Sequence, residues 1–429
     1  MTNIEKYMNN YFKGCKNPSL NAMKYLMNEY NNFEKEMKFI HIAGTNGKGS
    51  CVEMMNNILI NQGYKVGKFI SPHLIKYNER ISINNKNITD KELEDLIREL
   101  EPKVNKYNAI NKIPITFFEI TTFVALLYFY RKNVDIVILE TGLGGLYDCT
   151  NIITSPLISI ITSIGYDHMH MLGNTLPKIA YQKAGIIKKN SSTVVFEQSE
   201  EINQVFIDIC KKENNNLHLI YKNQITNYSY DRDYQYFDYK DFKNLIINLK
   251  GKKQIENAAI CIESIKILNE LGYNVTKKNI RNGLKTVIHK ARMEVINKKP
   301  LVIFDGAHNE PAVENFMNNV KMYYNEDKKI YVVSILKNKN YKKMIELLMK
   351  DKEGTFIFTS GNDDNRYISN VEMYNIAKKY LKNQKIYKMN LDEAINYVIE
   401  NCVNEVSFFV GSFYVYDYII NEINTNNKK

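Results

Sequence analysis

A glycine-rich turn near the start of the chain constrains the fold more than any other feature of the sequence. The apolar run Lys38–Ala43 has the composition of a buried strand, and apolar spacing typical of a helix follows from Ser50 to Gln62, where Gly63 would end it. Between them lies the turn, which consists of Gly44, Thr45, Asn46, Gly47, Lys48, Gly49 and Ser50. A strand, a glycine turn and a helix in this order predict the first unit of a parallel α/β sheet.

The same alternation continues along the chain. Short apolar runs predict further strands in the first part at 65–70, 134–140 and 157–164. After a Tyr-rich segment with period-two alternation (227–242), strands are predicted again at 301–306, 329–336, 355–360 and 406–412. We therefore expect a doubly wound, mostly parallel α/β domain with a small antiparallel appendage over residues 1–290, and a second Rossmann-like α/β domain over 295–429.

Composition excludes several classes of protein. A chain of 429 residues with 44% hydrophobic residues can bury the cores of two domains and is not disordered. Its net charge of +11 fits an anionic small-molecule substrate or an ordinary solvated surface better than a nucleic acid, because no basic and aromatic cluster accompanies it. The apolar stretch 117–130 is too short to span a bilayer, and the six cysteines lack metal-ligand spacing. We expect a cytoplasmic, monomeric protein with reduced thiols, no membrane partner and no nucleic-acid partner.

The glycine turn has the chemistry of a phosphate-binding loop. Its glycines allow backbone N–H groups to point at phosphate oxygens beside a helix N-terminus. Lys48 could then reach the terminal phosphates, and the Ser50 hydroxyl could ligate Mg²⁺. The spacing differs from the common G-x-x-x-x-G-K-[ST] pattern because Gly49 separates Lys48 from Ser50. A structural turn alone would explain the glycines but not this lysine and serine.

Candidate metal ligands follow other predicted strands. Glu140 ends the 134–140 strand, Ser71 follows the 65–70 strand, and His168 follows the 157–164 strand. The carboxyl ends of parallel strands share one edge of a sheet, so these side chains could join Ser50 there and supply two Mg²⁺ sites. His168 taken alone would be a hydrogen-bonded structural residue. Lys183, judged by its local sequence alone, would be a solvated helix residue.

The ordered set of motifs resembles the folylpolyglutamate synthase/dihydrofolate synthase family of the Mur ligase superfamily. The resemblance covers nearly the whole chain and rests on GTNGKGS (44–50), SPHLIKYNERI (71–81), FFE (117–119), ETGLGGLYDCTN (140–151), ITSIGYDHMHMLGNTLPKIAYQKAGIIK (161–188), KQIENA (253–258), ARMEV (291–295), DGAHNEPA (305–312), LKNKNY (336–341) and GSFYV (411–415). It implies an ATP-dependent ligase that activates a folate carboxylate as an acyl phosphate and then joins it to glutamate.

The resemblance also implies roles for individual residues. Lys48 and the loop N–H groups would hold ATP, and Ser50, Ser71, Glu140 and His168 would ligate Mg²⁺. Lys183 matches a lysine that is carbamylated in relatives, which makes it a catalytic candidate together with Lys48 and His308. The other implied contacts are Asn257, Arg292 and Asp305 for ATP, and His73, Arg80, Asp148, His308 and Ser412 for the folate and glutamate substrates.

Three departures from the family pattern limit what the resemblance implies. Leu146-Tyr147 stands where bifunctional relatives carry Arg-Leu, Lys253 replaces a histidine, and Asn338 replaces an aspartate. The first departure bears on dihydropteroate as a substrate more than on polyglutamylation. Two other functions stay open at this point: a ligase of UDP-linked muropeptides, and a basic P-loop ATPase that binds nucleic acid.

Overall fold

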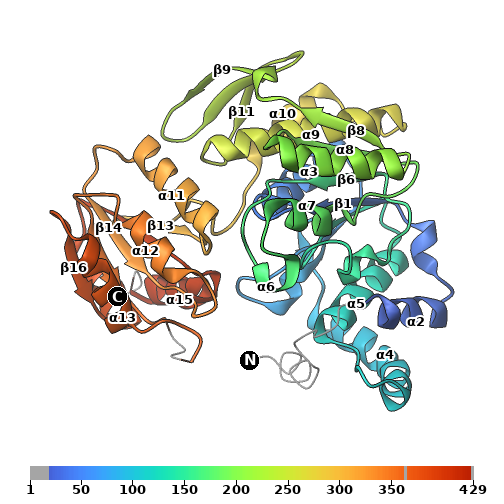
Figure 1. The fold of residues 1–429 in the computed structure, drawn as a ribbon, viewed down its shortest axis with the longest axis horizontal. Coiled ribbons are helices and arrows are strands. Elements are labelled where there is room, and N and C mark those ends of the chain that lie inside the picture. The colour runs from blue at the N-terminus through green and yellow to red at the C-terminus, as the bar shows by residue number, and fades with distance from the viewer. Residues whose placement is uncertain (1–18, 362–364, 427–429) are drawn as a thin grey trace. The chain divides into compact units, whose positions relative to one another are not determined.

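The computed structural model describes residues 19–361 and 365–426. The chain folds into two compact units. The first unit takes the chain up to Tyr228 together with Tyr236–Ile247 and Gln254–Val287, and the second takes Ser229–Gln235, Asn248–Lys253 and the chain from Ile288 onward. The two units are shown in Figure 1. The assignment of functions to domains 1–290 and 295–429 stays a prediction.

An eight-stranded sheet forms the centre of the first unit (Figure 1). In spatial order its strands are β4 (Lys86–Asn87), β3 (Ile81–Ile83), β2 (Val66–Phe69), β5 (Ile136–Glu140), β1 (Phe39–Ala43), β6 (Ile158–Ile161), β7 (Ser192–Phe196) and β8 (Asn216–Ile220). The six strands from β2 to β8 are parallel, while β3 and β4 pair antiparallel at one edge. The predicted doubly wound, mostly parallel sheet is confirmed.

Helices cover this sheet because its strands are apolar on both faces. Phe39, Val137 and Leu139 share a core cluster with apolar residues of helices α2, α4 and α5, whereas α3 contacts β1, β2 and β5. The helices of this unit are α2 (Asn21–Glu29), α3 (Lys48–Gln62), α4 (Asp90–Ile110), α5 (Phe117–Arg131), α6 (Met169–Leu172), α7 (Leu176–Ala184), α8 (Glu200–Lys212), α9 (Lys252–Glu270) and α10 (Lys277–Thr286). Burial of such side chains contributes about 2 kcal/mol each to stability.

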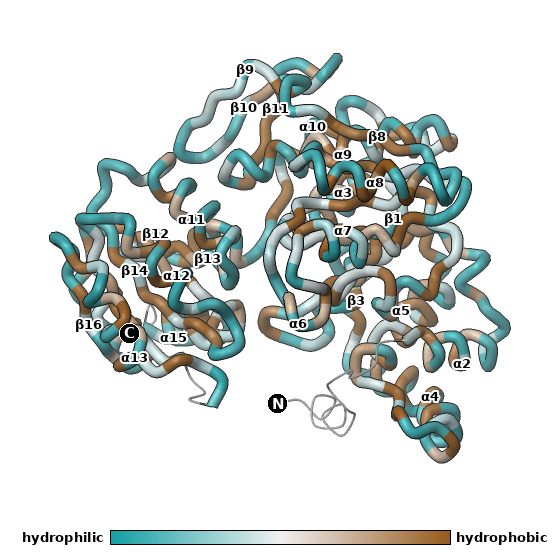
Figure 2. The backbone as a smooth tube through the Cα atoms, viewed as in Figure 1, coloured by the Kyte–Doolittle hydropathy of each residue, from teal (hydrophilic) through white to brown (hydrophobic). Residues whose placement is uncertain are grey.

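A three-stranded sheet confirms the predicted appendage. It consists of β9 (Ile225–Tyr230), β10 (Gln235–Tyr239) and β11 (Phe242–Ile247), in the order β11-β10-β9. The connections between its strands are too short for parallel crossovers, so the strands run antiparallel. Most β9 residues are exposed or half-buried, and the strand is largely hydrophilic in Figure 2.

The second unit contains a six-stranded sheet in the order β12-β13-β17-β14-β15-β16. Its strands are β12 (Glu294–Lys298), β13 (Leu301–Asp305), β14 (Lys329–Val333), β15 (Thr355–Phe358), β16 (Lys385–Lys388) and β17 (Val406–Val410). All are parallel except β12, which confirms the predicted Rossmann-like α/β arrangement. The helices of this unit are α11 (Glu310–Tyr323), α12 (Tyr341–Leu348), α13 (Asn370–Ala377), α14 (Leu391–Asn401) and α15 (Tyr416–Asn426).

Two further observations bear on the expectations from the sequence. Cys51, Cys149, Cys210, Cys261 and Cys402 are all free, while Cys15 lies outside the described residues. Across 19–361 and 365–426, no helix has both the length and the hydropathy required to cross a membrane.

Candidate active site

The topology of the first unit brings the predicted phosphate-loop and metal residues to one edge of the sheet. Ser71 follows β2, Glu140 ends β5, Ser50 lies in the first turn of α3 after β1, and His168 follows β6. In the sheet these strands are direct neighbours in the order β2-β5-β1-β6, and all four are parallel. The four candidate ligands therefore come from four adjacent strand ends, as the sequence predicted.

The phosphate loop is held against the segment that follows β6. The Thr45 N–H donates to the Ser163 carbonyl at 2.8 Å, and the Ser163 hydroxyl donates to the Asn46 carbonyl at 3.1 Å. The loop backbone lies so close to Thr162 that a Cβ on Gly44 would be 1.7 Å from Thr162 Oγ1. Thr162 and Ser163 were not among the predicted site residues, since only the tertiary fold brings them to the loop. Their contacts hold the loop backbone against the segment that follows β6.

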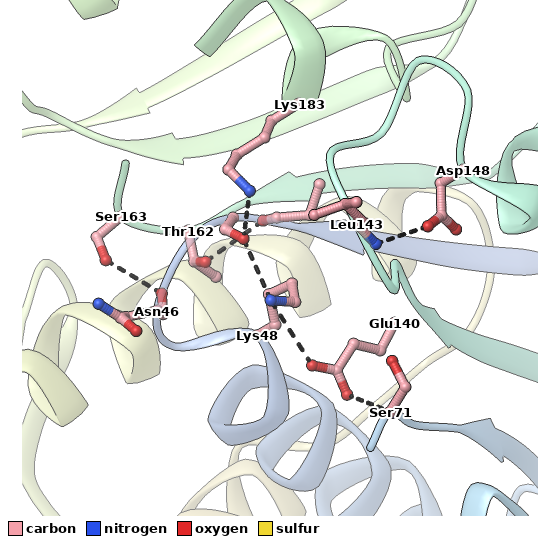
Figure 3. A network of polar contacts seen from close by, with 11 residues as sticks. Asn46, Lys48, Ser71, Glu140, Leu143, Asp148, Thr162, Ser163 and Lys183 are labelled. Carbon is pink, nitrogen blue, oxygen red and sulfur yellow. Dashed lines mark hydrogen bonds and ion pairs between the residues drawn. The ribbon is translucent and has the colours of Figure 1, made fainter. Parts of the chain in front are cut away.

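Three charged groups meet beside this loop. Lys48 Nζ donates to the Gly44 carbonyl at 3.2 Å, and Lys183 Nζ donates to the same oxygen at 2.7 Å. Glu140 Oε1 lies 4.0 Å from Lys48 Nζ, and Glu140 Oε2 accepts a hydrogen bond from the Ser71 N–H at 3.3 Å. Figure 3 shows Lys183 reaching the loop from α7, opposite Lys48 and Glu140. The structure thus joins Lys183 to the predicted ATP site.

Lys183 is not a solvated helix residue. Its side chain is only 4% exposed. Burial, aided by the positive charge of Lys48, lowers the pKa of Lys183 from 10.5 to about 7, while Asp167 and Asp148 partly oppose the shift. A large fraction of its amine is therefore neutral near pH 7, which is unusual for lysine and typical of a functional site.

His168 and its neighbour Asp167 are more exposed to solvent than Lys183. The His168 side chain is 40% exposed, and its Nε2 lies 3.8 Å from Asp167 Oδ1. Within the described part of the chain, no three His, Cys, Asp or Glu side chains form a cluster that could hold a metal. A cation here would therefore depend on hydroxyl, water and phosphate oxygens as well as Glu140, which suits Mg²⁺ better than Zn²⁺.

The predicted substrate residues of the first unit have well-defined partners. His73 Nδ1 accepts from Arg80 Nε at 2.9 Å, and burial together with Arg80 lowers the pKa of His73 to about 4. The Arg80 guanidinium lies over the rings of Tyr77 and Phe117. His73 is consequently neutral at physiological pH, and Arg80 retains the positive charge of this pair.

Asp148 organises its own loop. Its Oδ2 accepts from the Leu143 N–H at 2.7 Å, while its Oδ1 accepts from the N–H and the hydroxyl of Thr150. The side chain is buried, and burial raises its pKa against the effect of these hydrogen bonds. The contacts show a structural role, and its predicted role in substrate binding stays a prediction.

Asn257 lies on α9 and packs against the phosphate loop. A Cβ on Gly47 would lie 2.8 Å from Asn257 Oδ1, and Asn257 Nδ2 donates to Gln254 at 3.2 Å. Asn257 therefore lies beside the phosphate loop, and its predicted contact with ATP stays a prediction.

Four predicted residues lie in the second unit, and two of them, Arg292 and His308, contact the ring of Phe413. Arg292 lies 4.7 Å from the centroid of the Phe413 ring, and the His308 ring lies 5.1 Å from it. Asp305 accepts from the N–H groups of Met293 and Ala307, and burial raises its pKa despite the nearby Arg292. Ser412 is buried and caps the turn that carries Phe413. Phe413 was present in the GSFYV motif but was not predicted as a site residue.

Two glycines at the ends of α3 allow the loop geometry to be tested. Gly47 and Gly63 both have positive φ, at 96° and 102°, so alanine at either position is expected to cost about 1 kcal/mol of stability. Only Gly47→Ala would also push Asn257 and the phosphate loop apart, because nothing lies within 4 Å of a Cβ on Gly63. We expect Gly47→Ala to weaken binding of an ATP analogue by at least about 10-fold, measured by calorimetry. Equal affinities of the two variants would contradict this role of Gly47.

Comparisons with known proteins identify two Mur ligase domains in this chain and several similar enzymes. The Mur ligase middle domain matches residues 42–265, and the Mur ligase glutamate ligase domain matches residues 291–413. The dihydrofolate synthase/folylpolyglutamate synthase of Bacillus subtilis is 37% identical over 339 residues, which cover 77% of this chain and 78% of the relative.

Solved structures give the same result over almost the whole length. Folylpolyglutamate synthase from Thermotoga maritima is 31% identical, with a TM-score of 0.83 over 99% of this chain and 96% of that one. Escherichia coli FolC in complex with DHPP and ADP is 25% identical, with a TM-score of 0.83 over 98% and 97% of the two chains. The chain therefore belongs to the dihydrofolate synthase/folylpolyglutamate synthase family of the Mur ligase superfamily.

Proposed function

We propose that this chain is an ATP-dependent amide ligase that adds L-glutamate to folates and also joins dihydropteroate to glutamate. The observation that carries the proposal is the meeting of Lys48, Lys183 and Glu140 beside a phosphate loop in a chain of this family. The proposed enzyme is a cytoplasmic monomer whose partners are the small molecules ATP, glutamate and a folate or dihydropteroate.

The chemistry would take place in two steps. A carboxylate oxygen of the folate attacks the γ-phosphorus of ATP, the bond to ADP breaks, and an acyl phosphate forms. The glutamate amine then attacks the acyl carbon, phosphate leaves, and the amine proton passes to solvent. Lys48 and the loop N–H groups would hold and neutralise the phosphates during the first step. Relatives solved with ADP support ATP as the substrate.

The residues at the strand ends fit Mg²⁺. Glu140 supplies a buried carboxylate, and Ser50 supplies a buried hydroxyl in the first turn of α3. Mg²⁺ prefers few protein oxygens together with water and phosphate, which agrees with this donor set. Ser50, Ser71, Glu140 and His168 would hold two ions, which would neutralise charge on the ATP phosphates.

Lys183 fits a carbamylated lysine. Its neutral amine would attack CO₂, forming an N–C bond and losing one proton, and the product is an anion in place of a cation. This change would remove the unfavourable meeting of two ammonium groups at the Gly44 carbonyl. Burial favours the neutral amine that this reaction requires.

The second unit would contribute to the glutamate step. His308, whose Nδ1 lies 2.8 Å from the Gly306 carbonyl, would stabilise the acyl phosphate or the incoming glutamate. Arg292 and Asp305 would contact ATP, and Ser412 would line the glutamate site. In the first unit, His73, Arg80 and Asp148 would contact the folate. Functional domains at 1–290 and 295–429 are part of this proposal.

The proposed function is tested with two substrates offered separately. Purified protein receives Mg-ATP, bicarbonate and glutamate with either a folate monoglutamate or dihydropteroate, and phosphate release and product mass are measured. The ratio of the two rates shows whether both activities are present. This comparison is needed because the half-exposed Tyr147 belongs to the departure from the bifunctional pattern that bears on dihydropteroate. If neither the folate monoglutamate nor dihydropteroate is turned over, the proposal is overturned. Turnover that requires a UDP-linked muropeptide or RNA instead would support one of the other two functions.

Carbamylation predicts a pH-dependent recovery of activity. Protein depleted of CO₂ should regain activity when CO₂ is restored, and the rate of recovery should rise as the pH rises through about 7. The sign follows from the lowered pKa of Lys183, because the reactive neutral amine increases above that pH. The measurement is the time course of ADP release at constant dissolved CO₂ and several pH values. A recovery rate that does not depend on pH would contradict the carbamate.

A further inference from the structure

The end of α7, which carries Lys183, lies directly against the glycine loop that follows β5. A Cβ on Gly145 would lie 2.7 Å from the Lys183 carbonyl oxygen, and a Cβ on Gly185 would lie 2.3 Å from the Leu146 backbone. In addition, the Leu146 N–H donates to the Gln182 carbonyl at 2.7 Å. Two backbone segments that are far apart in sequence therefore touch with no side chain between them.

In addition to this backbone hydrogen bond, one side-chain amide binds both segments. Asn151 Nδ2 donates to the Leu146 carbonyl at 3.0 Å and to the Gly185 carbonyl at 3.1 Å. The Asn151 side chain is 5% exposed, so water does not readily replace either hydrogen bond. The amide thus fixes the distance between the glycine loop and the last turn of α7.

Asn151 is itself anchored to the central strand of the sheet. It lies in the short 3-10 helix Cys149–Ile152, where its N–H donates to the Asp148 carbonyl at 2.8 Å. The adjacent Thr150 hydroxyl lies 2.8 Å from His41 Nε2 on β1. Burial lowers the pKa of His41 to about 3, so this contact does not change charge near neutral pH.

These contacts connect β1 to Lys183 and back to β1. Thr150 contacts His41 on β1, and its neighbour Asn151 binds the end of α7. Lys183 in the last turn of α7 then donates to the Gly44 carbonyl, directly after β1. We propose that Asn151 is a positioning residue that holds Lys183 at the phosphate loop, an inference that rests on the proposed role of Lys183 in the ligase reaction. Asn151 touches neither ATP nor the reacting atoms in this role.

The test compares Asn151→Ala with Gln384→Ala in the full-length protein. Gln384 is a matched control, because its buried amide also donates to two backbone carbonyls, those of Met349 and Asp351, but at the amino ends of strands in the second unit. Melting temperature, kcat, KM for ATP and incorporation of ¹³C-labelled CO₂ at Lys183 are measured for both variants and the wild type.

We expect Asn151→Ala to lower kcat by at least about 10-fold with little change in KM for ATP, and to reduce ¹³C incorporation, whereas Gln384→Ala lowers only the melting temperature. A kcat near the wild-type value, or equal kcat losses in both variants, overturns the proposal. If Asn151→Ala does not fold, Asn151→Ser, which keeps one donor, is judged by the same comparison. A wild-type protein without ligase activity overturns the proposed function, and this inference with it.

Discussion

Replacing Lys183 with methionine is expected to lower kcat by at least about 100-fold while the protein stays folded. Methionine fills a similar volume but lacks the nitrogen that lies 2.7 Å from the Gly44 carbonyl oxygen. It can neither carry a carbamate nor donate to the phosphate loop. The measurement is kcat and KM for ATP from ADP release with a folate and glutamate.

Lys188→Met is the matched control for this variant. Lys188 lies five positions later, beyond the end of α7, and burial lowers its pKa as well, while Glu213 opposes the shift. Its kcat is expected to stay within about 2-fold of the wild type, as for most substitutions outside a site. Near-normal turnover of Lys183→Met would remove Lys183 from the catalytic residues.

Lys183→Met is expected to stabilise the protein although it lowers kcat. In CO₂-free buffer, folding lowers the pKa of Lys183 from 10.5 to about 7, so the folded state binds the proton less tightly than the unfolded state does. The resulting destabilisation is fully present below pH 7 and decreases as the pH rises toward 10.5. Lys183→Met should therefore raise the melting temperature more at pH 7 than at pH 9, as expected where activity requires a strained site.

Most buried strands were predictable from their continuous apolar runs, and the strands at sheet edges were not. β1, β5 and β13 are buried along almost their whole length, so their composition alone indicates them. The prediction missed β8 and β16, which lie at the edges of their sheets and are largely exposed or half-buried, and it also missed β7, a buried strand inside its sheet. An edge strand needs fewer apolar residues, since solvent covers part of it.

Helix ends show a similar limit. Pro102 disfavours a helix that continues past it, yet α4 runs on to Ile110, because Val104 is still buried in the core. The residues of α15 after Ile420 are mostly polar, yet the helix extends to Asn426, because Ile419 and Ile423 are buried. In both places tertiary packing outweighs the local signal.

The candidate site was predictable where one motif contains the chemistry. Lys48, Ser50 and Glu140 follow from strand ends and glycine turns, and the fold brings them together. The role of Lys183 came only from the resemblance, since its burial depends on how α7 packs. Asn151 is the last residue of the 140–151 motif, but the sequence did not indicate its role. Its two carbonyl partners, those of Leu146 and Gly185, are close only in the folded chain.

Glu140→Gln is expected to lower kcat by about 100- to 1000-fold and to raise the Mg²⁺ concentration needed for half-maximal turnover. Glutamine keeps the size of the side chain and an oxygen that can accept from the Ser71 N–H. It removes the negative charge that lies 4.0 Å from Lys48 Nζ and that would attract a cation. The measurement is ADP release across a Mg²⁺ titration at fixed ATP.

Glu263→Gln separates the effect of this charge from the cost of breaking an ion pair. Glu263 is also buried, and its carboxylate pairs with Lys240 and accepts from Tyr239, each at 2.9 Å. Both variants leave a lysine without its anionic partner, but only Glu140 lies at the carboxyl edge beside the phosphate loop. Glu263→Gln should therefore lose stability and keep its Mg²⁺ dependence. If the two titrations coincide, Glu140 is a structural partner of Lys48, and the proposed metal site loses its only carboxylate.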